Sequence, residues 1–303
     1  MKFNNQKTLD YFLNDLFDRY QQHVPAVQQI TNALVERGVV GSQQEIINDH
    51  IAFRTLGVPH LGISSFEKIF LHHGYEKRDH YHFEQKKLNA YWYAPPSDQY
   101  PRIFISELMV DQLSEASQDI IHRYTDQVSS DPVDALDLDN GVEISEFFHR
   151  PLWDLPTKAD YEALLRESEY AAWVIYNRYY LNHYTISIHA LKEGYNTLAE
   201  FNSFVEGLGI RLNNADGKIK TSADGLLSQS STVAEVYDFD FPNGEQMKIS
   251  GSYVEFAERA VLPEFRHLDA QEIKSIHRRE GFETSNADKI FESTYLTQTN
   301  SSK

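Results

Sequence analysis

Histidines and carboxylates are the residues of this chain whose types and spacing could support metal chemistry. The chain holds 13 histidines and no cysteine, so any bound metal must take nitrogen and oxygen ligands. Two histidines, His50 and His183, stand near the beginnings of two strand-like runs. If these strands are equivalent and adjacent, a carboxylate from a third strand would complete a site of two histidines and one carboxylate, the ligand set of many non-haem iron(II) enzymes.

Two carboxylates compete for the third ligand position. Alternation with a period of two puts Glu255 on one face of an otherwise hydrophobic run, and a metal would explain a carboxylate there. Glu107 occupies the matching place at the end of an earlier run. The pattern alone leaves both open, and a strand histidine can equally be a hydrogen-bonded or surface residue.

Arg54 is a candidate for binding substrate. It shares a strand face with His50, and four residues of strand separate their α-carbons by about 13 Å. A short diacid would fit between a metal held by His50 and the guanidinium, which binds a carboxylate through two parallel N–H groups. The alternative is an ion pair between Arg54 and Asp49 or another local carboxylate.

The elements that position these residues form two blocks in which a strand, a helix and further strands follow in the same order. Three strands follow the helix in the first block and four in the second. Hydrophobic periodicity predicts two helices before the first block. The first block is expected to contain a strand from Asn48, a short helix over 66–70, and strands 75–81, 88–93 and 102–108. The second is expected to contain strand 181–190, helix 197–208, and strands near 218–221, 225–233, 235–241 and 246–259.

This order predicts an α+β fold in which paired βαβββ modules form a central curved sheet around a metal site, with additional helices before, between and after the modules. We expect one compact domain with five parts. They are a helical preface (1–47), a first module (48–127), a linker with helices (128–180), a second module (181–262) and a C-terminal helical tail (263–303).

Composition limits the partners. The formal charge of −17 repels phosphate backbones, so nucleic acid is not expected as a partner. The chain has no run of 18 apolar residues, and its N-terminus lacks the apolar core of a signal peptide. We therefore expect a cytoplasmic protein with no membrane partner, and make no prediction of its oligomeric state.

Four segments together resemble the 2-oxoadipate dioxygenase/decarboxylase family. They read Asn-Asp-His-Ile-Ala-Phe-Arg-Thr (48–55), Asn-His-Tyr-Thr (182–185), Leu-Leu-Ser-Gln-Ser-Ser-Thr (226–232) and Tyr-Val-Glu-Phe-Ala-Glu-Arg (253–259). The resemblance runs from the N-terminal helices through Arg259. The family is similar in fold to the vicinal oxygen chelate enzymes, whose paired βαβββ units match the repeat. The run 255–259 also resembles the metal-ligand strand of 4-hydroxyphenylpyruvate dioxygenase and hydroxymandelate synthase.

The resemblance implies a role for each candidate. It makes His50, His183 and Glu255 the ligands of Fe(II), so it favours Glu255 over Glu107. It makes Arg54 the group that holds the distal carboxylate of a substrate bound beside His50 and His183, and Gln229 a residue that orients substrate or water. The implied reaction converts 2-oxoadipate and O2 to 2-hydroxyglutarate and CO2, a step in lysine catabolism. Bacterial members are considerably longer, and part of their substrate pocket comes from segments toward the C-terminus that have no recognisable counterpart in this sequence.

Two other classes of function stay open. The same scaffold and ligands would serve a non-oxidative isomerase or lyase of the vicinal oxygen chelate type, with zinc, nickel or manganese as a Lewis acid. Alternatively, the chain is a metal-free binding module with structural histidines and an acidic surface that meets a basic partner.

Overall fold

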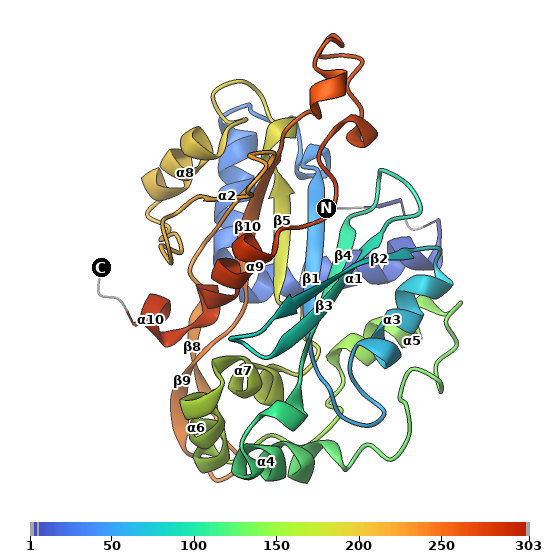
Figure 1. The fold of residues 1–303 in the computed structure, drawn as a ribbon, viewed down its shortest axis with the longest axis vertical. Helices are drawn as coiled ribbons and strands as arrows, with labels where there is room; N and C mark the ends of the chain where they lie inside the picture. The colour runs from blue at the N-terminus through green and yellow to red at the C-terminus, as the bar shows by residue number, and fades with distance from the viewer. Residues whose placement is uncertain (1–2, 5, 301–303) are drawn as a thin grey trace.

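A curled eight-stranded sheet forms the centre of the molecule, which we describe from a computed structural model covering residues 3–4 and 6–300 (Figure 1). The strand order is β2-β3-β4-β1-β5-β10-β7-β6. The strands of this sheet are β1 (Asn48–Leu56), β2 (Glu76–Phe83), β3 (Leu88–Ala94), β4 (Arg102–Leu108), β5 (His183–Ser187), β6 (Lys220–Thr221), β7 (Leu227–Ser231) and β10 (Tyr253–Arg259).

The two halves of the sheet have the same topology. In the first half β1 pairs in parallel with β4, and in the second half β5 pairs in parallel with β10. The other pairings are antiparallel, including the β1–β5 pair that joins the halves. The predicted fold of paired βαβββ modules is thus confirmed, and the first strands of the two modules are neighbours at the centre.

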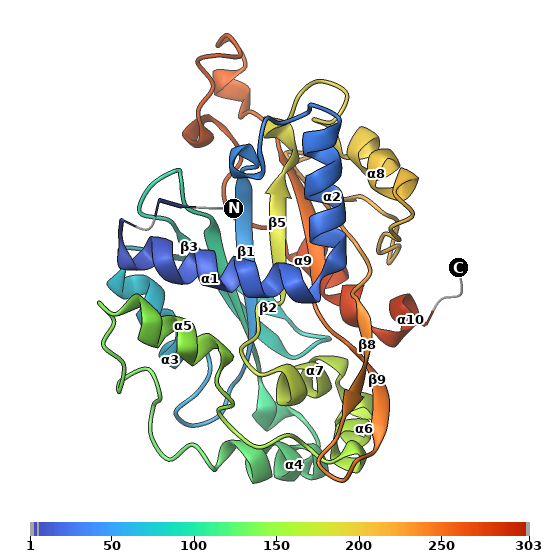
Figure 2. The same ribbon diagram turned by 180° about the vertical axis from the view of Figure 1, so that it is seen from behind.

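Three details differ from the prediction. The expected strand 246–259 is two strands, because β9 (Gln246–Ser250) leaves the sheet and pairs only with β8 (Val236–Asp240). This hairpin lies beside the helices between the modules (Figure 2). The ring of Phe239 packs there 5.1 Å from that of Tyr176. The expected strand 181–190 ends at Ser187 in a 3-10 turn, and helix 141–149 was not predicted, although the Asn140 side chain caps its first turn.

Helices cover one face of the sheet, here called the outer face (Figure 2). Phe53 of β1 points to this face, and His50, three residues earlier, points to the opposite, inner face because side chains alternate along a strand. Apolar side chains at helical spacing pack on the outer face against β1, and the ring of Phe53 lies 4.8 Å from Phe66 and 5.5 Å from Phe148. None of the described helices has the length and apolar character to cross a membrane. The α-helices are α1 (Thr8–His23), α2 (Pro25–Glu36), α3 (Ile63–His72), α4 (Glu115–Thr125), α5 (Gly141–His149), α6 (Lys158–Glu167), α7 (Glu169–Asn177), α8 (Leu198–Gly207), α9 (Thr284–Phe291) and α10 (Leu296–Thr299).

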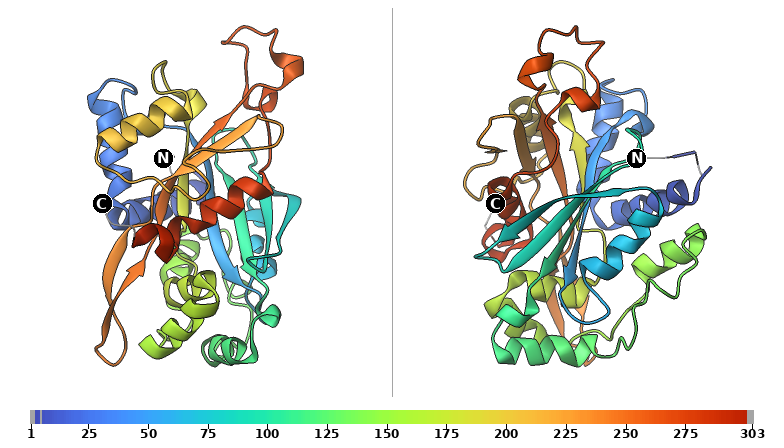
Figure 3. Two further views of the ribbon diagram at one scale, coloured as in Figure 1. Left: turned by 60° about the vertical axis from the view of Figure 1, so that its left-hand side comes forward. Right: turned by 45° about the vertical axis from the view of Figure 1, so that its right-hand side comes forward.

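The inner face of the sheet, which carries His50, is covered by the C-terminal segment. Helix α9 runs across the opening of the curled sheet (Figure 3) and contacts β2 of the first module and both β6 and β7 of the second. The tail therefore lies over the predicted metal site.

Candidate metal centre

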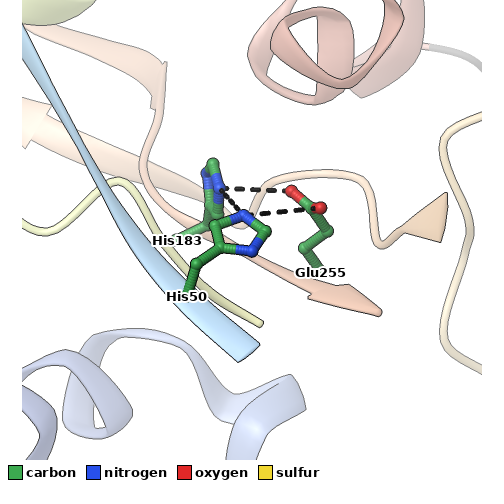
Figure 4. Close-up of side chains that lie close together, drawn as sticks. All are labelled: His50, His183 and Glu255. Atoms are coloured by element: carbon green, nitrogen blue, oxygen red, sulfur yellow. Dashed lines mark hydrogen bonds and ion pairs between the residues drawn. The ribbon is translucent and has the colours of Figure 1, made fainter. Parts of the chain in front are cut away.

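Three adjacent strands bring the predicted ligands together. β1 and β5 pair with Ala52 opposite His183, and β10 lies beside β5 with Glu255 next to Thr185. Because side chains alternate between the two faces of a strand, His50, His183 and Glu255 all point to the inner face (Figure 4). All three are buried.

The separations of the donor atoms suit a single ion. His183 Nε2 lies 3.1 Å from Glu255 Oε2 and 3.3 Å from His50 Nε2, and His50 Nε2 lies 3.6 Å from Glu255 Oε1. Two donors bound to one ion at about 2.1 Å, at right angles, are about 3 Å apart. Within the part of the chain that the structure describes, this is the one group of at least three His, Cys, Asp or Glu side chains able to hold a metal.

The hydrogen bonds behind the rings indicate which nitrogens face the site. His50 Nδ1 lies 2.8 Å from Asp49 Oδ1, and His183 Nδ1 lies 2.9 Å from Asn182 Oδ1. A neutral ring that donates its Nδ1 proton to these oxygens turns the Nε2 lone pair toward Glu255. Two ring lone pairs and a carboxylate then converge in a buried space. This donor set fits a divalent cation.

The two histidines differ electrostatically. Burial lowers the pKa of His50, but the Glu255 carboxylate and the Asp49 hydrogen bond outweigh it, so the pKa of His50 is raised above its ordinary value. Burial and the charges of His50 and Arg54 lower the pKa of His183 well below its ordinary value. His183 therefore offers a neutral ring nitrogen as a ligand.

Gln229 lies against the ligand carboxylate. Its Nε2 donates a hydrogen bond of 2.6 Å to Glu255 Oε1, and its Oε1 accepts one of 3.2 Å from Asn286 Nδ2 on α9. Gln229 is therefore in the site, and its role in orienting substrate or water stays a prediction.

Arg54 is a buried cation on the same face as His50. Its Nη1 donates to Thr294 Oγ1 at 3.0 Å, and its Nη2 donates to the carbonyl of Phe291 at 3.1 Å. The Nε of Arg54 and the hydroxyl of Tyr253 are buried, and each lacks a hydrogen-bond partner among the described residues. No carboxylate in the described chain pairs with Arg54, and Asp49 pairs with Arg259 instead. The alternative of an Arg54–Asp49 ion pair is therefore wrong.

Side chains nearly fill the space beside the metal ligands. The cavity there measures about 20 Å³, room for about one water molecule. Phe282, Ile290 and Phe291 of the C-terminal segment line it, and the Phe282 ring lies 4.7 Å from the His50 ring. A separate cavity of about 820 Å³ is lined in part by Trp92 and Arg259, and both of these side chains lie against the Phe282 ring.

Glu107, the competing carboxylate, lies on the outer face. It is paired with Thr55 of β1, and its Oε2 accepts a hydrogen bond of 2.7 Å from the backbone N–H of Ile63 at the start of α3. Sequence reasoning missed Asp49 and Asn182 as the side chains behind the histidines. The signal was available, because each immediately precedes its histidine at the start of a module.

Comparison with known proteins gives one consistent family. The family model of 2-oxoadipate dioxygenase/decarboxylase matches residues 12–271. A chloroplastic 2-oxoadipate dioxygenase/decarboxylase of Arabidopsis thaliana is 45% identical over 269 residues, which are 84% of this chain and 70% of the relative.

Solved structures agree with this result. The hydroxyglutarate synthase of Oryza sativa, crystallised in complex with 2-oxoadipate, has a TM-score of 0.88 and 41% identity, covering 95% of this chain and 92% of its own. A putative glyoxalase superfamily protein of Ralstonia eutropha has a TM-score of 0.69 at 20% identity, covering 93% of this chain and 89% of its own. At that identity the second likeness concerns the fold alone.

Proposed function

The chain belongs to the 2-oxoadipate dioxygenase/decarboxylase family, and from this premise we propose that it is an iron(II) enzyme that converts 2-oxoadipate and O2 to 2-hydroxyglutarate and CO2. The observation that carries the proposal is the placement of His50, His183 and Glu255 on one buried face, with the unpaired cation Arg54 on the same face of β1. An all-N/O site beside a buried cation suits a 2-oxo acid with a second carboxylate.

His50, His183 and Glu255 would hold the metal. Iron(II), when bound, would supply the activation of O2 and the oxidative loss of the C1 carboxylate as CO2. Three protein ligands leave coordination positions for the 2-oxo acid and for O2. The contact of His183 Nδ1 with Asn182 Oδ1 and the hydrogen bond from Gln229 to Glu255 keep these two ligands directed at the site.

Arg54 would orient the substrate. Its Nη atoms donate to Thr294 and Phe291, and its Nε–H has no hydrogen-bond acceptor among residues 3–4 and 6–300. The Nε edge of the guanidinium is thus available to a carboxylate, and the hydroxyl of Tyr253, which interacts electrostatically with Arg54, is a second donor in the same region. A diacid held at both ends keeps its reacting carbon beside the metal, which is catalysis by positioning.

The apolar cover would exclude water during the reaction. Phe104, Phe282, Ile290 and Phe291 leave space for about one water molecule beside the ligands. A substrate of six carbons needs more room, so the C-terminal segment must shift to admit it. Its closure over bound substrate would keep bulk water away from the oxidant.

The test is O2 uptake after anaerobic reconstitution of the untagged protein with iron(II). The panel contains 2-oxoadipate, 2-oxoglutarate and 2-oxohexanoate, a monoacid with the same number of carbons as 2-oxoadipate. We expect one O2 consumed and one CO2 released per 2-oxoadipate, with 2-hydroxyglutarate identified by mass. Absence of O2 uptake with every 2-oxo acid would reject the proposal and favour a non-oxidative isomerase or lyase.

Membership of an enzyme family argues against the metal-free binding module. The partners are then the 2-oxo acid and O2, and the step belongs to lysine catabolism. The cytoplasmic location stays a prediction, since the Arabidopsis thaliana relative is named as chloroplastic.

A further inference from the structure

The two histidine ligands have different side chains behind them. Asp49 accepts the hydrogen bond of His50 Nδ1, whereas the amide oxygen of Asn182 accepts that of His183 Nδ1. The two backing residues stand at equivalent places, immediately before the histidine in each module. The Nδ1 atom of one ligand therefore has a negatively charged partner, and that of the other has a neutral partner.

A buried arginine fixes the Asp49 carboxylate. Arg259 Nε donates to Asp49 Oδ2 at 2.6 Å, and Arg259 Nη2 donates to Oδ1 at 2.9 Å, which is a two-pronged pair. Both residues are 1% exposed. Arg102 Nη1 lies 3.6 Å from Oδ2. Asp49 thus has a single orientation, with Oδ1 directed at His50.

Arg259 also binds the backbone immediately before Phe282, one of the residues that line the metal site. Its Nη1 donates to the carbonyls of Arg279 at 3.0 Å and Gly281 at 2.7 Å. The next residue is Phe282, whose ring lies 5.4 Å from the Arg259 guanidinium carbon and 4.7 Å from the His50 ring. The same arginine therefore positions the residue behind a ligand and the aromatic ring over it.

We propose that Asp49, oriented by Arg259, is a positioning residue that sets the direction and tautomer of His50 and so the affinity of the centre for metal. The inference rests on the proposed function, because it takes His50 as a ligand. A carboxylate that accepts the second N–H of a ligand histidine fixes the ring and strengthens its donor nitrogen, and loss of such a partner lowers metal affinity about 10–100-fold. Asn182 orients the ring of His183 in the same way but carries no negative charge.

The test compares the Co(II) affinity of full-length variants by competition with a chromophoric chelator. Asp49→Asn keeps the size of the side chain and gives His50 the kind of partner that His183 has naturally. We expect its Co(II) affinity to fall about 10–100-fold and the Co(II) absorption spectrum to change. Asp10→Asn is the matched control, because Asp10 is a buried carboxylate that accepts a hydrogen bond from Tyr100 away from the metal site. Its affinity should equal that of the wild type.

A second variant separates positioning from folding, because Asp49→Asn leaves the Arg259 cation unpaired. The double variant Asp49→Asn/Arg259→Gln removes both charges. The inference predicts that the double variant, shown to be folded by a cooperative melting transition, still binds Co(II) at least tenfold more weakly than the wild type. Wild-type affinity in the double variant would overturn the inference and leave the proposed function standing. A wild-type protein that binds no Co(II) and takes up no O2 with iron(II) would overturn the proposed function, and the inference with it.

Discussion

Replacement of Arg54 tests how the site distinguishes a diacid from a monoacid. Arg54→Met keeps an unbranched side chain that can lie between the rings of Tyr170 and Trp173, whose centres are each 5.1 Å from the guanidinium carbon. It removes the charge and all five N–H donors. The variant should retain iron, because Arg54 contacts none of the three ligands through a hydrogen bond.

The magnitude follows from the contacts of the guanidinium. A charge-assisted hydrogen bond contributes about 1.5–3 kcal/mol, so a two-pronged pair to the distal carboxylate contributes about 3–6 kcal/mol. Existing bonds to Thr294 and the Phe291 carbonyl lessen the net gain if substrate displaces them. We therefore expect a loss of about 3–4 kcal/mol, a fall in kcat/KM for 2-oxoadipate of about 10²–10³-fold.

The assay is O2 uptake with 2-oxoadipate and with 2-oxohexanoate, which has no distal carboxylate. Arg54→Met should lower kcat/KM for the diacid far more than for the monoacid. Thr294→Val is the control, since it removes one acceptor of Arg54 but leaves the guanidinium in place. An equal fall for both substrates in Arg54→Met would refute the reasoning, because it would make Arg54 only an anchor of the C-terminal segment.

Three further predictions concern the ligands, the competing carboxylate and a buried lysine. Alanine at His50, His183 or Glu255 should each lower bound iron by elemental analysis, and wild-type metal content in all three variants would reject the triad. Glu107→Ala should leave metal content unchanged but lower the free energy of unfolding by about 1–2 kcal/mol in urea, because Ile63 N–H at the start of α3 loses its acceptor. Burial lowers the pKa of Lys220 to about 8, below its unfolded value of about 10.4. Between these two pH values the unfolded chain therefore holds a proton that the folded chain has released. The free energy of unfolding should therefore rise with pH between about 8 and 10, and Lys220→Met should reduce that rise. Identical pH profiles of the wild type and the variant would contradict the assignment of the rise to Lys220.

The sequence by itself determined which side chains could bind a metal, and much of the order of strands and helices that positions them. The absence of cysteine restricted a metal to nitrogen and oxygen ligands, and the period of two placed His50 and Arg54 on one face of β1. The repeated order of strands and helix predicted that the two central strands would be neighbours. These features are local, and hydrophobic periodicity records them directly.

Only the tertiary structure decided which distant groups meet. Glu107 and Glu255 both lie on the last strand of a module, and strand register turns Glu107 to the outer face beside Thr55 but Glu255 to the face of His183. Register depends on pairing between strands far apart in the chain, and a shift of one residue reverses every side chain. The pairing of Asp49 with Arg259 and the closure of the site by Phe282 are likewise contacts between distant segments, and alternation within one strand carries no information about them.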